Sequence, residues 1–136
     1  MNFDLEPKYK DIQTAALDLT RKIEPMAIEA DSLSVVHGGV LEALKESGLC
    51  RLMVPAKYGG TFDSIDPLAI CVAREAMMAT SSHLDSLFAL QGIGSYAITV
   101  AGSDAQRSEW LPRIAKLEAL GALALTEEMA GSDLKA

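Results

Sequence analysis

The stretch Asp-Pro-Leu-Ala-Ile-Cys-Val-Ala, residues 66–73, shows most directly how this chain folds. Asp66 is a residue that typically caps the start of a helix, and Pro67 is a typical first helical residue. The six residues that follow are apolar on every side of such a helix, so few of its faces are expected to be exposed. The stretch therefore predicts a central helix with other helices packed around it.

Two helices are predicted before this one. Residues from about 8 to 30 place apolar side chains three or four positions apart, which gives one apolar stripe: Ile12, Ala16, Leu19, Ile23, Met26 and Ala30. Pro25 is expected to kink that helix or end its regular part, because its ring removes a backbone donor. A second helix over residues 39–47 ends at Gly48. Residues 49–60 lack a helical period and predict an ordered loop.

Two more helices are predicted after it. Residues 82–101 form the fourth, and Ser82 with Asp85 has the spacing of a capping box. Ser103 with Gln106 repeats that spacing and begins the fifth. The fifth helix is expected to carry one apolar face and to bend at a proline within its pattern: Trp110, Ile114 and Leu117 on the face, Pro112 at the bend.

The pattern changes after the fifth helix. Residues 119–126 are a short apolar run between turn-forming residues, which predicts a strand. A lone strand cannot satisfy its backbone donors and acceptors, so a sheet is expected to follow. We therefore predict an all-α fold of about five helices over residues 1–118, and the first strand of a second domain over residues 119–136.

Composition excludes several functional classes. The chain has 136 residues, with 12 Lys plus Arg against 19 Asp plus Glu, so its formal net charge is −7. Nucleic-acid binding is not expected, because a surface that follows phosphates needs clustered basic residues. Hydrophobic residues make up 49%, which excludes a disordered chain. The mean hydropathy of +0.18 leaves apolar surface that a partner domain or subunit is expected to cover.

The cysteines and the apolar segments bear on the compartment. Cys50 and Cys71 match no zinc or redox spacing, so buried, reduced thiols are expected. The N-terminus has no secretory signal pattern, which favours the cytoplasm or a comparable reducing compartment such as a mitochondrial matrix. Residues 86–103 carry no charge, but their polar and glycine residues favour a buried helix over a membrane span.

Isolated ionisable residues give no catalytic or metal site by themselves. His37 and His83 have no cysteine or carboxylate at metal-ligand spacing, so we interpret them as surface or helix-end residues. Glu127 and Glu128 are the one pair of carboxylates near the polar loop that follows the predicted strand. Neighbours in an extended segment point to opposite faces, so Glu127 is interpreted as structural and Glu128 as solvated.

That polar loop belongs to a set of motifs distributed along the chain. Residues 125–133, Leu-Thr-Glu-Glu-Met-Ala-Gly-Ser-Asp, follow the pattern of an apolar residue, Thr and Glu, then Gly-Ser-Asp. Upstream stand Gly-Leu at 48–49, Val-Pro at 54–55 and Tyr-Gly-Gly at 58–60. A third group is Ala-Gly-Ser at 101–103, Gln-Arg at 106–107, Trp-Leu-Pro at 110–112 and Ile-Ala at 114–115. Together, in this order, they resemble the acyl-CoA dehydrogenase family over nearly the whole chain.

The resemblance implies a fold and a cofactor. The family has an N-terminal helical domain, a middle β-domain and a C-terminal helical bundle, so this chain would be the first domain with the first strand of the second. By resemblance, residues 123–132 would line FAD, and the expected cofactor-binding residues are Leu123, Leu125, Thr126, Gly131 and Ser132. Ser132 would also reach the acyl-CoA. Glu128 stands where the family usually has proline.

The resemblance also implies the reaction and the partners. The family removes the α-proton of an acyl-CoA with a carboxylate while a hydride leaves the β-carbon for flavin. That carboxylate lies in the C-terminal domain of most members, so no residue of this chain is expected to be catalytic and none to bind metal. A homotetramer and electron-transfer flavoprotein as the acceptor are the usual partners in the family.

Two alternatives remain open at this stage. The chain could belong to an acyl-CoA oxidase or to a related flavin monooxygenase or nitroalkane oxidase, in which reduced flavin passes its electrons to oxygen. It could also be a truncated, non-catalytic helical interaction module. The reactivity of reduced flavin with oxygen distinguishes the first alternative from a dehydrogenase. Stable folding without exposed strand edges would favour the second alternative, and aggregation of the 136-residue chain would count against it.

Overall fold

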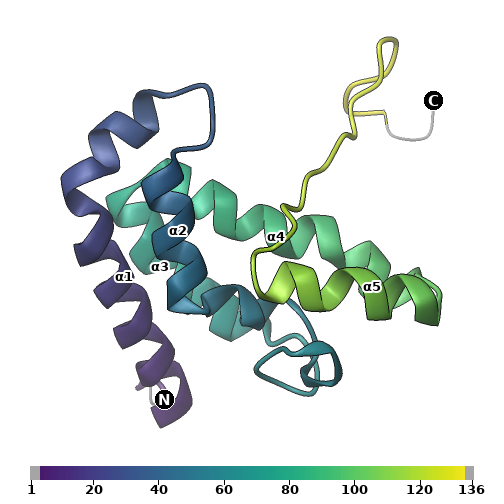
Figure 1. Ribbon diagram of the computed structural model, residues 1–136, viewed down its shortest axis with the longest axis horizontal. Coiled ribbons are helices and arrows are strands. Elements are labelled where there is room, and N and C mark those ends of the chain that lie inside the picture. The colour runs from purple at the N-terminus through teal and green to yellow at the C-terminus, as the bar shows by residue number, and fades with distance from the viewer. Residues whose placement is uncertain (1–3, 134–136) are drawn as a thin grey trace.

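The computed structural model describes residues 4–133, and over this range the chain forms five α-helices. They are α1 Pro7–Ser32, α2 Gly38–Ser47, α3 Pro67–Thr80, α4 Ser82–Ala101 and α5 Asp104–Ala115. Two short 3-10 helices, η1 Leu49–Met53 and η2 Ala56–Tyr58, lie in the predicted loop. In Figure 1, α1, α2 and α3 pack together at one end of the molecule, and α4 leads from them to α5. The predicted all-α fold is confirmed.

Most predicted helix ends are confirmed by their caps. The Asp66 carboxylate accepts hydrogen bonds from the backbone N–H groups of Leu68 and Ala69, at 3.0 and 3.3 Å. Gly48 ends α2 in the left-handed conformation, with φ of 68°, which glycine adopts without steric cost. Ser103 and Gln106 form the capping box of α5, with bonds of 2.8 and 3.3 Å.

One prediction about helix ends is wrong, and one of the two outcomes expected at Pro25 does not occur. The cap of α4 is Ser81, whose hydroxyl accepts from the backbone N–H of Leu84 at 3.2 Å, so Ser82 and Asp85 do not form a capping box. Asp85 is instead buried, and its carboxylate binds an arginine that is described below. Pro25 does not end α1, which continues to Ser32. The second half of α1 has its own tertiary contacts, because Ala27 and Ala30 are buried there.

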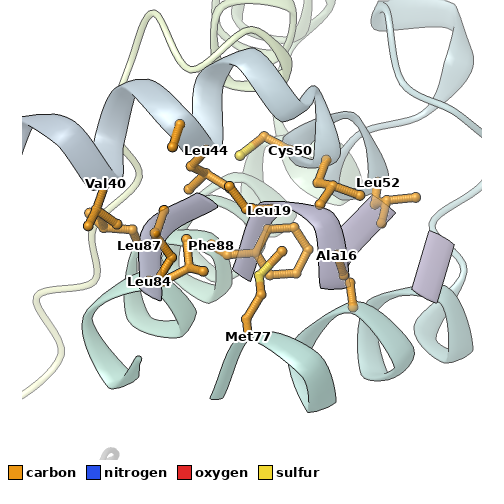
Figure 2. Close-up of a cluster of buried hydrophobic side chains, with 14 of the residues drawn as sticks. Ala16, Leu19, Val40, Leu44, Cys50, Leu52, Met77, Leu84, Leu87 and Phe88 are labelled. Carbon is orange, nitrogen blue, oxygen red and sulfur yellow. The ribbon is translucent and has the colours of Figure 1, made fainter. Parts of the chain in front are cut away.

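The core lies where the first four helices meet. The predicted stripe of α1 is confirmed, with four of its six members buried and Ile12 and Met26 half-buried against the core: Ala16, Leu19, Ile23 and Ala30 are the four. Figure 2 shows Phe88 of α4 among side chains from α1, α2, η1 and α3. Phe88 is fully buried. Its ring therefore joins α4 to the other helices.

Three side chains lie differently from the prediction. Leu68 and Cys71 leave one face of α3 exposed, so α3 is not covered all round. The prediction of buried thiols is therefore wrong for Cys71 and confirmed for Cys50, and burial raises the pKa of the Cys50 thiol to about 12. Trp110 is 36% exposed, and α5 buries Leu111 in its place. The Trp110 ring instead lies beneath the guanidinium of Arg113, 4.8 Å from its centre.

The predicted strand is not formed in the described part of the chain. Residues 120–126 are extended without ladder partners, and the one pairing beyond them joins Glu127 to Ala130. The reason is physical, because no second strand is present to pair with this segment. Residues 134–136 of the predicted second domain lie outside the described residues. Across residues 4–133, no helix has the length and hydropathy that a membrane span needs.

Candidate functional site

The expected cofactor-binding residues lie on a projecting segment, residues 121–133, which we call the tail. Figure 1 shows it in yellow, rising away from α4 and α5. Leu123 and Leu125 are 54% and 50% exposed, and Thr126, Gly131 and Ser132 are exposed as well. The structure therefore places these five residues along one segment but does not gather them around a cavity.

The tail is fixed to α4 at its first residue. The backbone N–H of Gly121 donates to Oε1 of Gln91 at 3.0 Å, and Nε2 of Gln91 donates to the carbonyl of Leu87 at 3.1 Å. Gln91 is 1% exposed, so both polar ends of this buried side chain are satisfied. A Cβ atom on Gly121 would lie 2.4 Å from the carbonyl oxygen of Leu90, so only glycine fits without a shift here.

Beyond this anchor, the tail turns back once. Glu127 and Ala130 exchange two backbone hydrogen bonds of 3.1 and 3.3 Å, which close a tight turn. Both Glu127 and Glu128 are exposed. The hydroxyls of Thr126 and Ser132 make no hydrogen bond with any residue in the described range.

These groups fit a flavin by their chemistry. Two exposed leucines offer apolar contact to a flat aromatic ring, and two hydroxyls without a protein partner can bond ring heteroatoms or phosphate oxygens. Gly131 has nothing within 4 Å of its Cβ position, so a ligand can approach its backbone closely.

A pocket that the sequence did not indicate lies between α3 and α4. Its volume is about 410 Å³, and its lining is apolar apart from one arginine: Met53, Ile65, Ile70, Arg74, Ala89, Gly92, Ile93 and Tyr96. A Cβ on Gly92 would lie 2.7 Å from Sδ of Met53, so a larger residue at 92 would displace the Met53 side chain in the pocket wall. Ile70 and Arg74 are four residues apart, so they lie on one face of a helix. This spacing is the signal that could have indicated the α3 side of the pocket.

The arginine is held by a carboxylate of α4. Nε and Nη2 of Arg74 donate to the two carboxylate oxygens of Asp85, at 2.9 and 2.7 Å. The side chain of Asp85 is 4% exposed and that of Arg74 is 46% exposed. The hydrogen bonds with Asp85 are the largest of the causes that raise the pKa of Arg74. The pair fixes the guanidinium against α4 at the edge of the pocket.

A second polar cluster holds helix ends together. The Asp31 carboxylate, at the end of α1, accepts from the hydroxyls of Ser81 and Ser82 and from the backbone N–H groups of Ser82 and His83, at distances of 2.5 to 3.3 Å. Nε2 of His83 accepts from the backbone N–H of His37 at 3.0 Å. Nδ1 of His37 accepts from the N–H of Val40 at 3.2 Å.

This cluster confirms the interpretation of the two histidines as helix-end residues. His37 caps α2, and His83 lies in the first turn of α4. In the described part of the chain, no three metal-ligating side chains come together. The cluster therefore holds the end of α1 and the start of α2 against the start of α4.

Comparisons with known proteins agree on one family. The sequence profile described as "Acyl-CoA dehydrogenase, N-terminal domain" matches residues 7–118. A probable acyl-CoA dehydrogenase, FadE25 of Mycobacterium tuberculosis, is 29% identical over 132 residues, which are 96% of this chain and 33% of that protein. This chain thus spans about a third of the length of such relatives.

Two solved structures share the fold. Butyryl-CoA dehydrogenase from Megasphaera elsdenii superposes with a TM-score of 0.85 and 26% identity, over 98% of this chain and 36% of that one. An acyl-CoA dehydrogenase complexed with FAD, from Bacillus anthracis, superposes with a TM-score of 0.81 and 26% identity, over 96% of this chain and 23% of that one.

Proposed function

This chain belongs to the acyl-CoA dehydrogenase family, whose N-terminal domain it matches over residues 7–118, and from that premise we propose that it is the N-terminal part of a FAD-dependent acyl-CoA dehydrogenase. The complete enzyme would catalyse α,β-dehydrogenation of an acyl-CoA thioester. The observation that carries the proposal is the apolar pocket between α3 and α4. The tail adds two hydroxyls without a protein partner in the described range, which suit a flavin.

The tail would hold the cofactor in this proposal. When bound, FAD supplies the acceptor for the hydride that leaves the β-carbon. Leu123 and Leu125 would give apolar contact to the ring system, and the Thr126 hydroxyl would bond a ring heteroatom. Gly131 would admit the ligand close to the backbone, and the Ser132 hydroxyl would reach the cofactor or the acyl-CoA.

The pocket would hold the acyl chain. Apolar walls from α3 and α4 gain free energy when an alkyl chain displaces water, at roughly 25 cal/mol for each Å² of apolar surface buried. Ile70, Ile93 and Tyr96 would exclude water from the chain and orient it. The α-proton must be removed by a carboxylate. No carboxylate lines the pocket among the described residues, and both oxygens of Asp85 already bind Arg74. We therefore propose that the base lies outside this chain.

The partners follow from the same proposal. A homotetramer and electron-transfer flavoprotein as the electron acceptor would complete the enzyme. The oxidase and monooxygenase alternatives differ in one measurable property, because their reduced flavin reacts rapidly with oxygen. A non-catalytic helical module would bind neither flavin nor acyl-CoA.

The first test uses the complete gene product that contains this chain. We expect it to purify with FAD and to lose the visible absorbance of oxidised flavin when acyl-CoA is added without oxygen. Absence of both flavin and acyl-CoA binding would contradict the proposal. Rapid return of the absorbance on admission of oxygen would favour the oxidase alternative.

The second test addresses the tail residue by residue. Thr126→Val keeps the side-chain shape but removes the hydroxyl, so we expect FAD to bind about three- to tenfold more weakly, the effect of one hydrogen bond. Thr14→Val is the matched control, because Thr14 is an exposed residue of α1 whose hydroxyl bonds only the carbonyl of Lys10. Equal FAD affinity in the two variants would contradict the role of Thr126.

A further inference from the structure

Arg74 brings one uncommitted hydrogen-bond donor group to the apolar pocket. Its Nε and Nη2 are both taken by Asp85, whereas Nη1 makes no hydrogen bond with any residue from 4 to 133. The other seven lining residues offer only apolar side chains, a glycine and one tyrosine. Because the bidentate pair fixes the guanidinium plane of this lining residue, the position of Nη1 is fixed as well.

Arg74 and the tail meet α4 at different places along its length, because Arg74 binds Asp85 in the first turn of α4. The tail meets α4 at Gly94, where a Cβ would lie 2.9 Å from the backbone nitrogen of Ala122. Asp85 precedes Gly94 by nine residues, which corresponds to roughly 13 Å along a helix that rises 1.5 Å per residue. If the thioester lies by the tail, as the proposed function requires, the far end of the acyl chain points towards Arg74.

We propose that Arg74 is a specificity-determining residue that selects acyl groups with an uncharged oxygen, such as a hydroxyl or carbonyl, at their far end. An acyl chain that ends in an alkyl group would cover Nη1 and exclude solvent water from it. The N–H groups of Nη1 would then have no hydrogen-bond acceptor. An oxygen at the same place accepts a hydrogen bond from Nη1. The side chain of Arg74 is 46% exposed in this chain, so the discrimination acts once the bound acyl chain covers Nη1.

The charges of Arg74 and Asp85 distinguish between acyl groups that end in a hydroxyl and acyl groups that end in a carboxylate. Arg74 and Asp85 together carry no net charge, and Asp85 is almost wholly buried beside the guanidinium. A carboxylate at the end of the acyl chain would gain the bond from Nη1 but would be repelled by the carboxylate of Asp85. The expected order of affinity is therefore hydroxyl first, with the alkyl and carboxylate ends weaker.

The test measures binding without turnover. Three acyl-CoA thioesters of one chain length, ending in methyl, hydroxyl or carboxylate, carry sulfur in place of the β-carbon so that they cannot be oxidised. Their Kd values for the complete gene product are measured by isothermal titration calorimetry. We expect the hydroxyl ligand to bind about three- to tenfold more tightly than the methyl ligand.

Variants test whether Arg74 causes this preference. Arg74→Met combined with Asp85→Leu removes the whole pair, because loss of Arg74 alone would leave a buried carboxylate without its partner. We expect the double variant to prefer the methyl ligand. The matched control combines Arg21→Met with Asp18→Leu, which removes an exposed Arg–Asp pair of α1 with the same 2.7 Å separation, and should keep the hydroxyl preference.

The outcomes separate this inference from the proposed function. Equal binding of the methyl and hydroxyl ligands by the wild type would overturn the role of Arg74 while leaving the acyl-CoA proposal intact, and so would a hydroxyl preference that survives the double variant. If the double variant fails to fold, the wild-type comparison still decides whether the preference exists. Failure of all three thioesters to bind would overturn the proposed function, and this inference with it.

Discussion

At the scale of single residues, the Asp31 carboxylate joins the end of α1 to the start of α4. It accepts four hydrogen bonds from the start of α4, among them those of Ser81 and His83. The hydrogen bond from Ser81, followed by those from His83 and Ser82, lowers the pKa of Asp31 in the folded protein. One side chain therefore replaces the missing intrahelical partners of two N–H groups and connects α1 to α4.

This lowered pKa makes stability depend on pH in a definite direction. The stabilisation is complete above the unfolded-state pKa of about 3.9 and is lost as the pH falls through the lower folded-state pKa. We expect Asp31→Asn to lose less stability than the wild type between neutral pH and about pH 3, as measured by urea unfolding. Glu24→Gln, at an exposed position of the same helix, is the control and should follow the wild-type pH dependence. Parallel curves for the wild type and Asp31→Asn would refute the assignment.

At the scale of elements, helix ends were largely predictable because their signals are local. Asp66, Gly48 and Ser103 each act within three residues of their own position. The cap of α4 was misplaced by one residue because Ser81 and Ser82 are both good caps. Asp31, fifty residues away, binds both serines, and no local pattern contains that information.

Periodicity alone could not show which side of an apolar helix stays uncovered. The run in α3 is apolar all round, yet Leu68 and Cys71 are exposed while Ala69 and Val72 are buried. Which face is buried depends on where α1 and α4 pack, and that is a tertiary property. The predicted strand failed for the same kind of reason, because a strand exists only with a partner.

The anchor between the tail and α4 can be tested at this scale. Gly121→Ala places a Cβ 2.4 Å from the Leu90 carbonyl, which must displace the tail or α4. We expect the free energy of unfolding to fall by about 1–3 kcal/mol, the usual cost of overpacking, measured by denaturant titration. Gly38→Ala is the matched control, because nothing lies within 4 Å of its Cβ position. Equal stability of the two variants would show that the tail is not anchored there.

At the scale of the whole molecule, sequence motifs predicted the tail of the proposed site but could not predict its pocket. Thr126 and Ser132 were identified by resemblance, and the structure leaves their hydroxyls accessible. The pocket was missed because its walls come from α3, α4 and η1, which meet only after folding. Arg74 was missed with it, since a lone arginine on a helix usually indicates a solvated face.

The exposed tail predicts how the 136-residue chain behaves by itself. Its expected flavin-binding residues stand on one projecting segment, so under the proposed function this chain would supply one side of the cofactor site. We expect the isolated chain to bind FAD weakly or not at all, as measured by equilibrium dialysis. A tight one-to-one complex of FAD with this chain alone would contradict the division of the site between this domain and others.

The position of Phe88 in the core has a consequence for synthesis on the ribosome. Its ring lies among side chains from α1, α2, η1 and α3, so those earlier elements surround a space that a later element must fill (Figure 2). Domains generally fold as units while the chain emerges from its N-terminus. The nascent chain therefore holds its first helices in an incompletely packed state, with apolar surface accessible to chaperones, until the first two turns of α4 have left the exit tunnel.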